Sequence, residues 1–241
     1  MPCHSIRIGT AGWSIPAAQA ADFPAEGSHL LRYAGQLPAV EINSSFYRPH
    51  RPATYARWAG TVPDDFRFAV KVPKEITHVL RLVGAGEVLA RFLEETGNLG
   101  PKLGPLLLQL PPSLAFQPDI ASSFLENFRA LFDGQMVCEP RHPSWFTVEA
   151  EALLVAHRIP RVAADPQPAR GAGRPGGWPG LRYWRLHGSP RMYYSAYPPE
   201  RLERLAALLR EADAESWVIF DNTAEGAAWA DALSLLGSVT R

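Results

Sequence analysis

Cysteine and net charge are both scarce in this sequence. Its 241 residues include two cysteines, Cys3 and Cys138, and 24 Asp and Glu residues balance 24 Lys and Arg residues. Two cysteines exclude a disulfide framework, and no CxxC pair or Cys/His cluster indicates a zinc site. We therefore expect a reduced, cytoplasmic setting. A neutral chain is a poor candidate for bulk electrostatic binding, so we expect no membrane partner; nucleic acid is compatible with a local basic patch but is not indicated by the net charge.

Long hydrophobic runs and nucleotide-binding motifs are absent as well. Residues 1–15 lack the basic start and the apolar segment of a signal peptide. The longest uncharged stretch, residues 103–118, is interrupted by Pro105, Pro111 and Pro112, so it cannot form a membrane-spanning helix. Neither a GxGxxG nor a GxxxxGK[ST] motif occurs, which argues against the common nucleotide-binding folds.

The sequence does contain a regular alternation of strand-like and helix-like segments. Short apolar runs rich in β-formers are typical of parallel strands covered by helices. They span residues 6–9, 39–42, 67–72, 106–110, 136–139, 161–165, 182–186 and 217–221. Helical periodicity marks residues 86–98, 118–132, 144–157, 199–212 and 224–236, and more weakly 28–36 and 53–60. Eight alternations predict an α/β protein, a single (β/α)₈ TIM-like barrel domain over residues 1–241, with a doubly wound open sheet as the alternative.

Local signals refine this prediction at three places. Pro199 suits the first turn of its helix, and Asn222 with Glu225 predicts a capping box before the last helix. Residues 166–180 contain four prolines and five glycines, so they cannot form a regular helix. We expect an irregular sixth crossover that forms a surface connection, with a flap over the barrel mouth as the alternative.

Polar side chains gather at the predicted carboxyl ends of the strands, where barrel enzymes place their active sites. Glu41 and Glu139 are candidates for an acid/base pair, because two carboxylates in different environments can hold different protonation states. The alternative is that Glu41 pairs with Lys71, and Glu139 with Arg141 or Arg185. The three cations are candidate charge clamps, since lysine and arginine bind carboxylate and phosphate groups.

His187 is the third candidate catalytic residue. It follows Arg185 by two positions, so both side chains leave the strand on the same side, and imidazole titrates near neutral pH. We therefore predict a proton shuttle at His187. The predicted substrate-binding residues are Asn43, Tyr47, Lys71, Gln109, Arg141, His142, Arg185 and Asn222. The expected ligand is a small or oligomeric polar molecule, and phosphate-bearing compounds are among the candidates.

A metal site is an alternative for the same region. Glu139, Asp165, His187 and Asp221 close four successive predicted strands, and this order resembles that of barrel sugar isomerases and epimerases. Oxygen and imidazole ligands suit one Mn²⁺, Mg²⁺ or Zn²⁺ ion. Neighbouring arginines would repel a cation, so the main expectation is that no cofactor is needed.

The strand-end motifs together resemble the YecE-like family, domain of unknown function 72, over essentially the whole chain. The matching motifs are IGTAGW (8–13), VEINSSFY (40–47), FRFAVK (66–71) with TH (77–78), LGP (103–105), QLPP (109–112), EPRHPSW (139–145), YWRLHG (183–188) and FDN (220–222). The resemblance implies a (β/α)₈-like barrel and no established activity. The family usually has two asparagines where this chain has Asp221 and Asn222, and often has an aromatic residue in place of Pro140.

These observations lead to three functional hypotheses. The first is an enzyme, a hydrolase or isomerase, that performs metal-free acid/base chemistry on a polar anionic or sugar-like substrate. The second is a divalent-metal-dependent sugar isomerase, epimerase or endonuclease-like enzyme, which predicts sensitivity to chelators. The third is a non-catalytic protein that binds a phosphate-bearing ligand or single-stranded nucleic acid, which predicts salt-dependent binding. The substrate and the oligomeric state are not predicted.

Overall fold

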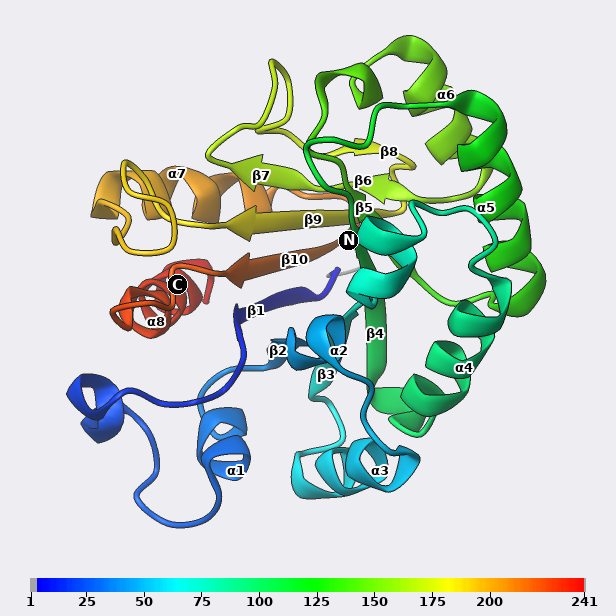
Figure 1. Ribbon diagram of the computed structural model, residues 1–241. Helices are drawn as coiled ribbons and strands as arrows, with labels where there is room; N and C mark the ends of the chain where they lie inside the picture. The colour runs from blue at the N-terminus through cyan, green and yellow to red at the C-terminus, as the bar shows by residue number, and fades with distance from the viewer. Residues whose placement is uncertain (1–3, 241) are drawn as a thin grey trace.

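The strands form a parallel sheet that curves into a barrel. The computed structural model describes residues 4–240. The ten strands have the order β7-β9-β10-β1-β2-β3-β4-β5-β6-β8. Their bounds are β1 (Ile6–Ala11), β2 (Ala39–Ile42), β3 (Arg67–Lys71), β4 (Leu103–Gln109), β5 (Met136–Glu139), β6 (Pro160–Arg161), β7 (Ala163–Asp165), β8 (Gly176–Gly177), β9 (Leu181–Leu186) and β10 (Glu215–Phe220). Figure 1 shows these strands side by side at the centre of the molecule.

The sixth predicted strand joins the two ends of this sheet. Its first part, β6, pairs with β5, and its second part, β7, pairs with β9. At the junction the Val162 N–H donates to the Cys138 carbonyl over 2.8 Å. One extended run therefore changes partner at Val162 and brings β5 next to β9. The predicted (β/α)₈ barrel is confirmed.

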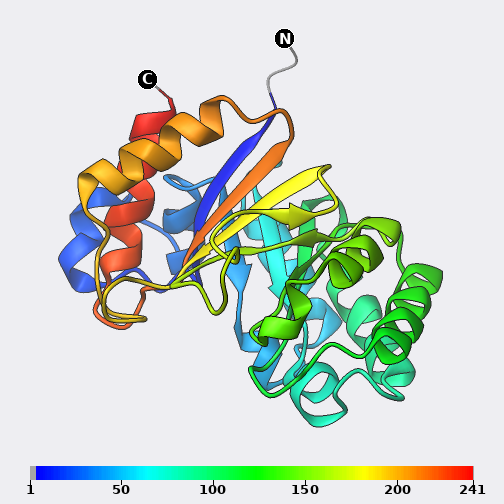
Figure 2. The same ribbon diagram turned by 90° about the horizontal axis from the view of Figure 1, so that it is seen from above.

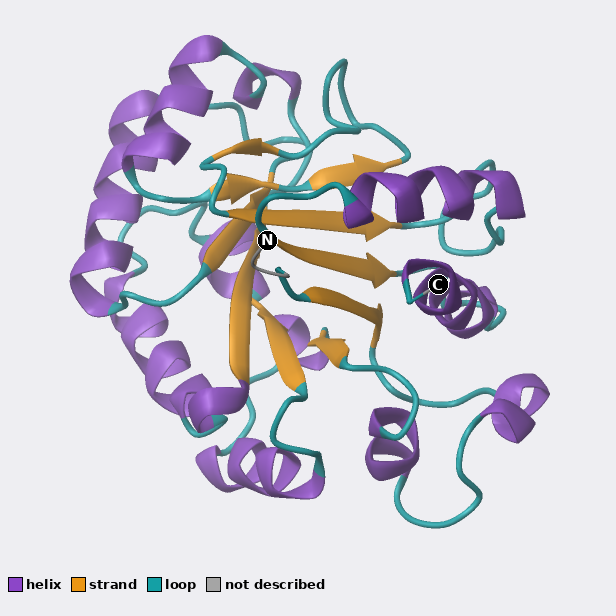
Figure 3. Ribbon diagram, turned by 180° about the vertical axis from the view of Figure 1, so that it is seen from behind, coloured by secondary structure: helices purple, strands orange, loops and turns teal. Residues whose placement is uncertain are grey.

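Helices surround the barrel. Their bounds are η1 (Ala17–Asp22), α1 (His29–Ala34), α2 (Ser44–Tyr47), α3 (Pro52–Thr61), η2 (Glu75–Val79), α4 (Gly86–Gly97), η3 (Gly100–Lys102), α5 (Pro118–Leu131), η4 (Pro143–Trp145), α6 (Val148–Ala156), α7 (Pro199–Arg210) and α8 (Ala227–Val239). Figure 2 shows α4, α5 and α6 on one side, with α7 and α8 packed together on the other. Figure 3 shows the strands inside this arc of helices. Within residues 4–240, no helix has both the length and the apolar character needed to cross a membrane.

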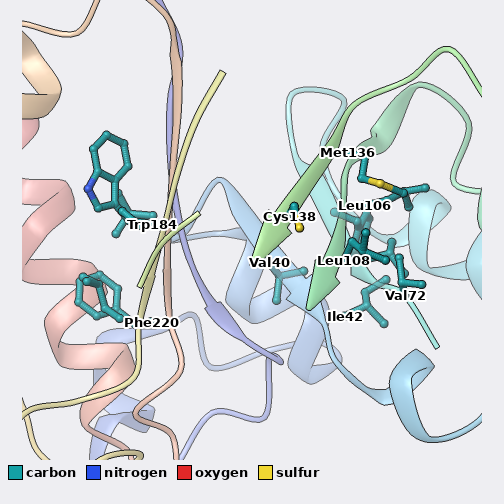
Figure 4. Packing of buried hydrophobic residues seen from close by; sticks show 14 of the residues in the cluster. Val40, Ile42, Val72, Leu106, Leu108, Met136, Cys138, Trp184 and Phe220 are labelled. Carbon is teal, nitrogen blue, oxygen red and sulfur yellow. The ribbon is translucent and has the colours of Figure 1, made fainter. Parts of the chain in front are cut away.

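Alternation along each strand separates two apolar cores. The outer core joins strands to helices; Figure 4 shows part of it, including Val40, Ile42, Leu106, Leu108, Met136 and Cys138. The other cluster consists of strand residues such as Ala39, Ala69, Leu107, Val137 and Trp217, and it fills the barrel interior. Successive side chains of a strand point to opposite faces. Two residues further along β2, β3, β4 and β5, the side chains therefore point inward again. These positions hold the polar residues Glu41, Lys71, Gln109 and Glu139.

The sixth crossover has no helix, as predicted. Its strand β8 runs antiparallel to β6, and the Trp178 N–H donates to the Ile159 carbonyl over 3.0 Å. The second part of the loop thus returns to the amino end of the sixth strand, which agrees with a surface connection, while the flap stays a prediction. Cavities of about 350 and 590 Å³ lie beside this loop on the outer face of β9, where α7 forms the opposite wall.

Two local expectations have different outcomes. Pro199 occupies the first turn of α7, as predicted. The capping box is wrong: α8 begins only at Ala227, after Gly226 with φ +83°. Asn222 instead donates from Nδ2 to the Ser195 carbonyl over 2.9 Å and to Asp231 Oδ2 over 2.7 Å. Of the two cysteines, Cys138 is buried in β5 and Cys3 lies outside the described residues.

The Gly177 backbone provides a test of how the sixth crossover is held. Its φ is +65°, and an added Cβ would lie 2.5 Å from the Ile159 carbonyl oxygen. Gly171 is a matched control, because its φ is +87° but nothing lies within 4 Å of an added Cβ. We expect Gly177→Ala to lower the free energy of unfolding by about 2 kcal/mol more than Gly171→Ala does. Urea unfolding of both variants measures this, and equal losses would show that the close approach is unimportant.

Candidate functional site

Arg185 lies at the centre of a buried polar cluster at the carboxyl end of the barrel. Its side chain is 1% exposed. Nη2 and Nε donate to the Glu41 carboxylate over 2.7 and 3.1 Å, and Nη1 donates to Glu139 Oε2 over 2.8 Å. Nη2 also donates to Asp221 Oδ2 over 2.9 Å. One planar guanidinium thus binds carboxylates that lie in β2, at the end of β5 and directly after β10, which is a task that arginine's fork geometry suits.

Further donors complete the coordination of these carboxylates. The Tyr183 hydroxyl donates to Glu41 Oε2 over 2.9 Å. Arg141 forms an ion pair with Glu139 through Nη2, and its side chain is 11% exposed. With Lys71 as a third cation nearby, the charges of the cluster balance. Such balance matters because an unpaired buried charge is costly.

His187 is enclosed by the same cluster. It is fully buried directly after β9, with Nδ1 3.0 Å from Asp221 Oδ2. Its Nε2 lies 2.9 Å from Arg141 Nη2 and 3.2 Å from Glu139 Oε1. A carboxylate can only accept, so the ring can donate to Asp221 from Nδ1 and to Glu139 from Nε2. The imidazole ring is therefore fixed on both sides by charged groups.

The charges determine the protonation of the cluster. Burial alone would raise the pKa of Glu139, but Arg185 and Arg141 outweigh it and hold that pKa well below its usual value. The pKa of Asp221 is lowered in the same way, because Arg185 and His187 outweigh its burial. The three carboxylates in turn outweigh desolvation and raise the pKa of Arg185. Glu139 and Asp221 are therefore ionised at neutral pH, and neither can act as a general acid.

Lys71 differs from the other cations of the cluster. It is the last residue of β3, and its Nζ lies 4.2 Å from the centre of the Phe46 ring. Within residues 4–240 it forms neither an ion pair nor a side-chain hydrogen bond, whereas Glu41, Glu139 and Asp221 are each bound to Arg185. Burial and the positive charge of Arg185 lower the pKa of Lys71 to about 8, although the carboxylates act in the opposite direction.

Two buried polar atoms near the cluster have no partner among the described residues. They are Asn43 Oδ1, directly after β2, and Arg141 Nε, just beyond β5. Buried polar groups are normally hydrogen-bonded, and an unsatisfied one costs about 1–3 kcal/mol. One free acceptor and one free donor thus lie on the side of the cluster where Lys71, Arg141 and Asp221 remain partly exposed.

The geometry corrects the roles predicted for the three catalytic candidates. Glu41, Glu139 and His187 are brought together but have no exposed surface. Both oxygens of Glu41 are bound by Arg185, so the alternative pair of Glu41 with Lys71 is also wrong. Glu139 pairs with both arginines, as its alternative stated. Arg185 itself is equally buried. In this structure these four side chains contact one another and offer at most 1% of their surface to solvent.

Several predicted binding residues lie outside this cluster or have another contact. Tyr47 is 78% exposed, and its ring packs edge-on against Phe46 with 5.1 Å between the ring centres. His142 accepts the Ser144 N–H at Nδ1 and so caps η4. Gln109 lies beside Glu139 in the β4–β5 register and is partly exposed. Asn222 is buried, and its hydrogen bond to Asp231 connects the loop after β10 to α8. Asn43, Lys71 and Arg141 remain the best-placed binding residues.

The four residues of the metal alternative do not converge. Glu139, His187 and Asp221 surround Arg185, whose guanidinium occupies the space between the carboxylates. Asp165 points to the outer face of its strand, where it accepts from Tyr197 and Arg201 over 2.7 Å each. In residues 4–240, no group of three His, Cys, Asp or Glu residues has the geometry of a metal site. The donor set therefore does not fit a divalent cation.

Sequence reasoning missed Tyr183. Its signal was present, because Tyr183 precedes Arg185 by two positions and must share its face of β9. The tyrosine looked like part of an apolar strand, and only the opposing Glu41 gives its hydroxyl a partner. The Glu41 carboxylate and burial raise the pKa of Tyr183, so this hydroxyl stays a donor.

Comparison with known proteins gives the family. Residues 7–241 match the family described as protein of unknown function DUF72. The chain belongs to the DUF72 family. It is 30% identical over 175 residues to the UPF0759 protein YecE of Escherichia coli (strain K12), which is 69% of this chain and 61% of YecE. It is 26% identical over 152 residues to the UPF0759 protein YunF of Bacillus subtilis (strain 168), which is 59% of this chain and 52% of YunF. The chain thus spans between half and two thirds of the length of these relatives.

Solved structures of DUF72 proteins share this fold. A family member from Enterococcus faecalis V583 has a TM-score of 0.82 at 22% identity, covering 98% of this chain and 96% of that one. A member from Thermotoga maritima MSB8 has a TM-score of 0.80 at 25% identity, covering 99% and 100%. The predicted resemblance to the YecE-like family is confirmed. None of these descriptions names an activity, so the chain is an uncharacterised barrel protein of this family.

Removing the central guanidinium tests the cluster. We expect Arg185→Met to lower the free energy of unfolding by about 3–5 kcal/mol, because it leaves buried carboxylates unpaired. Arg182→Met is the control on the same strand; its exposed pair with Asp213 is worth at most about 1 kcal/mol. Urea unfolding near pH 7 measures both.

The pH dependence distinguishes charge from packing. In the wild type the lowered pKa of Glu139 gives stability above its unfolded pKa that is lost as the pH falls through the folded value. In Arg185→Met, burial raises the pKa values of the carboxylates that have lost their partner. As the pH falls these carboxylates take up protons, and the cost of burying their charge disappears. The stability difference between the two proteins should shrink between about pH 7 and about pH 5. A constant difference would mean that lost packing is the cause.

Proposed function

We propose that this protein is an enzyme that performs metal-free acid/base chemistry on a small polar substrate with an anionic group. The observation that carries the proposal is that two partly exposed cations lie at this end of the barrel. Within residues 4–240, Arg141 Nε has no hydrogen-bond partner, and Lys71 Nζ contacts the Phe46 ring but forms no ion pair or hydrogen bond. Both groups lie at the carboxyl end of the barrel strands, where barrel enzymes bind their substrates.

The roles divide between a buried part and a partly exposed part. Arg185, Glu41 and Glu139 hold the strand ends together and fix the orientation of Arg141. Arg141 binds the anionic group of the substrate, because guanidinium donors form strong bonds with carboxylate and phosphate. Lys71 is the titrating group, since a pKa of about 8 leaves part of the amine neutral near physiological pH. Chemistry of this kind covers isomerisation and hydrolysis of polar compounds.

The other two hypotheses have less support. A metal-dependent enzyme would need ligands that surround a cation, whereas Arg185 already fills the space between these carboxylates. A nucleic-acid-binding protein would present a basic, aromatic surface, and 24 acidic residues balance 24 basic ones in this chain. The cluster at the mouth is similarly balanced in charge. The metal-dependent and nucleic-acid-binding hypotheses both remain predictions.

A ligand screen tests the proposed function. The protein is mixed with phosphorylated and carboxylated sugars, hydroxy acids and keto acids, and its melting temperature is recorded. We expect anionic compounds to raise the melting temperature, and NMR of the mixtures to show conversion of the bound compound. Arg141→Met should weaken binding by about tenfold or more, since a hydrogen bond to a charged group is worth about 1.5–3 kcal/mol.

Two variants make the screen interpretable. Arg141→Lys keeps the charge next to Glu139 but lacks Nε, so it should fold and still bind more weakly. Arg48→Met removes an exposed arginine outside the cluster and should bind like the wild type. Equal affinity in all four proteins would overturn the role of Arg141 and, with it, the proposed function.

Metal analysis tests the competing hypothesis directly. We expect protein purified without chelator or affinity tag, and then incubated with Mn²⁺ or Zn²⁺, to retain much less than one equivalent of metal by elemental analysis. The reason is that Arg185 would have to leave its carboxylates first. One equivalent that disappears in Asp221→Ala would favour the metal-dependent alternative.

A further inference from the structure

We propose that Lys71 is a nucleophile that forms an imine with an aldehyde or ketone group of the substrate. This inference rests on the proposed function, and it narrows the substrate to carbonyl compounds that also carry an anionic group. It is carried by the placement of the Lys71 amine at a strand end, beside an aromatic ring and without a carboxylate partner.

The surroundings of Lys71 keep its amine available. Within residues 4–240 Nζ forms no ion pair, and the three carboxylates that act on its pKa are each bound to Arg185. On its other side Nζ lies 4.2 Å from the centre of the Phe46 ring. The ring has no oxygen or nitrogen atom that could accept a hydrogen bond from the amine. Packing thus holds the amine in place. Once the ammonium group has lost a proton, its lone pair has no hydrogen-bond donor as a partner among the described residues.

The electrostatics increase the share of the neutral, nucleophilic form. Lysines act as imine-forming nucleophiles when desolvation or a neighbouring cation lowers their pKa. Both causes operate here, since burial and the charge of Arg185 together lower the pKa of Lys71 to about 8, against the three carboxylates that raise it. The cluster around Arg185 therefore has a functional consequence, because the guanidinium charge opposes the effect of these carboxylates on Lys71.

The proposed step balances without a metal or a redox partner. The Nζ lone pair attacks the carbonyl carbon, a C–N bond forms, and the carbonyl oxygen takes a proton to give a carbinolamine. The C–O bond then breaks, and the oxygen leaves as water with both protons that the amine carried. The imine nitrogen takes one proton from solvent. The resulting cation withdraws electrons from the adjacent carbon, which is the activation that metal-free isomerisation of a carbonyl compound requires.

The lysine content of the chain makes this inference easy to test. The sequence has only three lysines, Lys71, Lys74 and Lys102. Lys74 is exposed and lies three residues after Lys71, so it is a matched control within the same molecule. Lys102 donates to the Ala59 and Val62 carbonyls over 2.8 and 2.6 Å, so its amine is engaged. Each side chain can be quantified separately by mass spectrometry of its peptide fragments.

The experiment treats the full chain with formaldehyde or glyoxylate in the presence of cyanoborohydride, which reduces each imine to a stable amine. We expect formaldehyde to modify Lys71 at least about tenfold faster than Lys74 near pH 7.5, because an ordinary lysine is almost wholly protonated there. The rate at Lys71 should rise with a midpoint near pH 8. Labelling of Lys74 at the same rate as Lys71, or faster, would overturn the inference without any variant.

The anionic probe links this chemistry to Arg141. Glyoxylate carries a carboxylate next to its aldehyde, so Arg141→Lys should slow the reaction of glyoxylate at Lys71 several-fold more than it changes the reaction of formaldehyde there. Lys71→Arg removes the modified residue and should leave Lys74 labelled as before, which checks the assignment of the peptide.

The outcomes separate the two proposals. Anionic ligands that stabilise the wild type and not Arg141→Lys, together with an unreactive Lys71, would overturn the imine and leave the proposed function standing. A fast, selective reaction of Lys71 with formaldehyde, together with no effect of Arg141 on glyoxylate or on ligand binding, would keep the nucleophile and overturn the anionic substrate.

Discussion

The guanidinium of Arg185 is the interaction on which the polar end of this barrel depends. It joins carboxylates that come from strands on different sides of the barrel, and it does so without contact with solvent. A buried ion cluster adds little net stability compared with an apolar core, but the loss of one member is costly. The cluster is therefore a constraint rather than a source of stability, because each charge requires the others to remain.

This constraint determines which groups are left for chemistry. Glu41 and Glu139 look like an acid and a base in the sequence, yet in the barrel they are ligands of Arg185. Among residues 4–240, Asn43, Arg141 and Lys71 keep some exposure at the cluster together with an unsatisfied atom or, for Lys71, a charge without an ion pair. In the function proposed above, the reactive face therefore consists of the cations on the outer side of the cluster, and the carboxylates act through them.

Several features of the fold could be read from the sequence because they depend on local rules. Strand alternation separates inward from outward residues, so the polar layer above the apolar interior follows from residues two positions apart. Proline and glycine content excluded a helix in the sixth crossover. Asp165 shows the limit of such reasoning: the sixth strand changes partner at Val162, and Asp165 faces outward to Tyr197 and Arg201, away from Glu139.

The sequence by itself determined the barrel, the strand ends that carry polar residues, and the family. Periodicity and short motifs depend on neighbours along the chain, and these are visible without a fold. Only the tertiary structure decided which charges pair, since Glu41 meets Arg185 across 144 positions of sequence rather than the nearer Lys71. Barrel closure places the two side chains at hydrogen-bond distance, so Glu41 pairs with Arg185, and Lys71 forms no ion pair with any residue from 4 to 240.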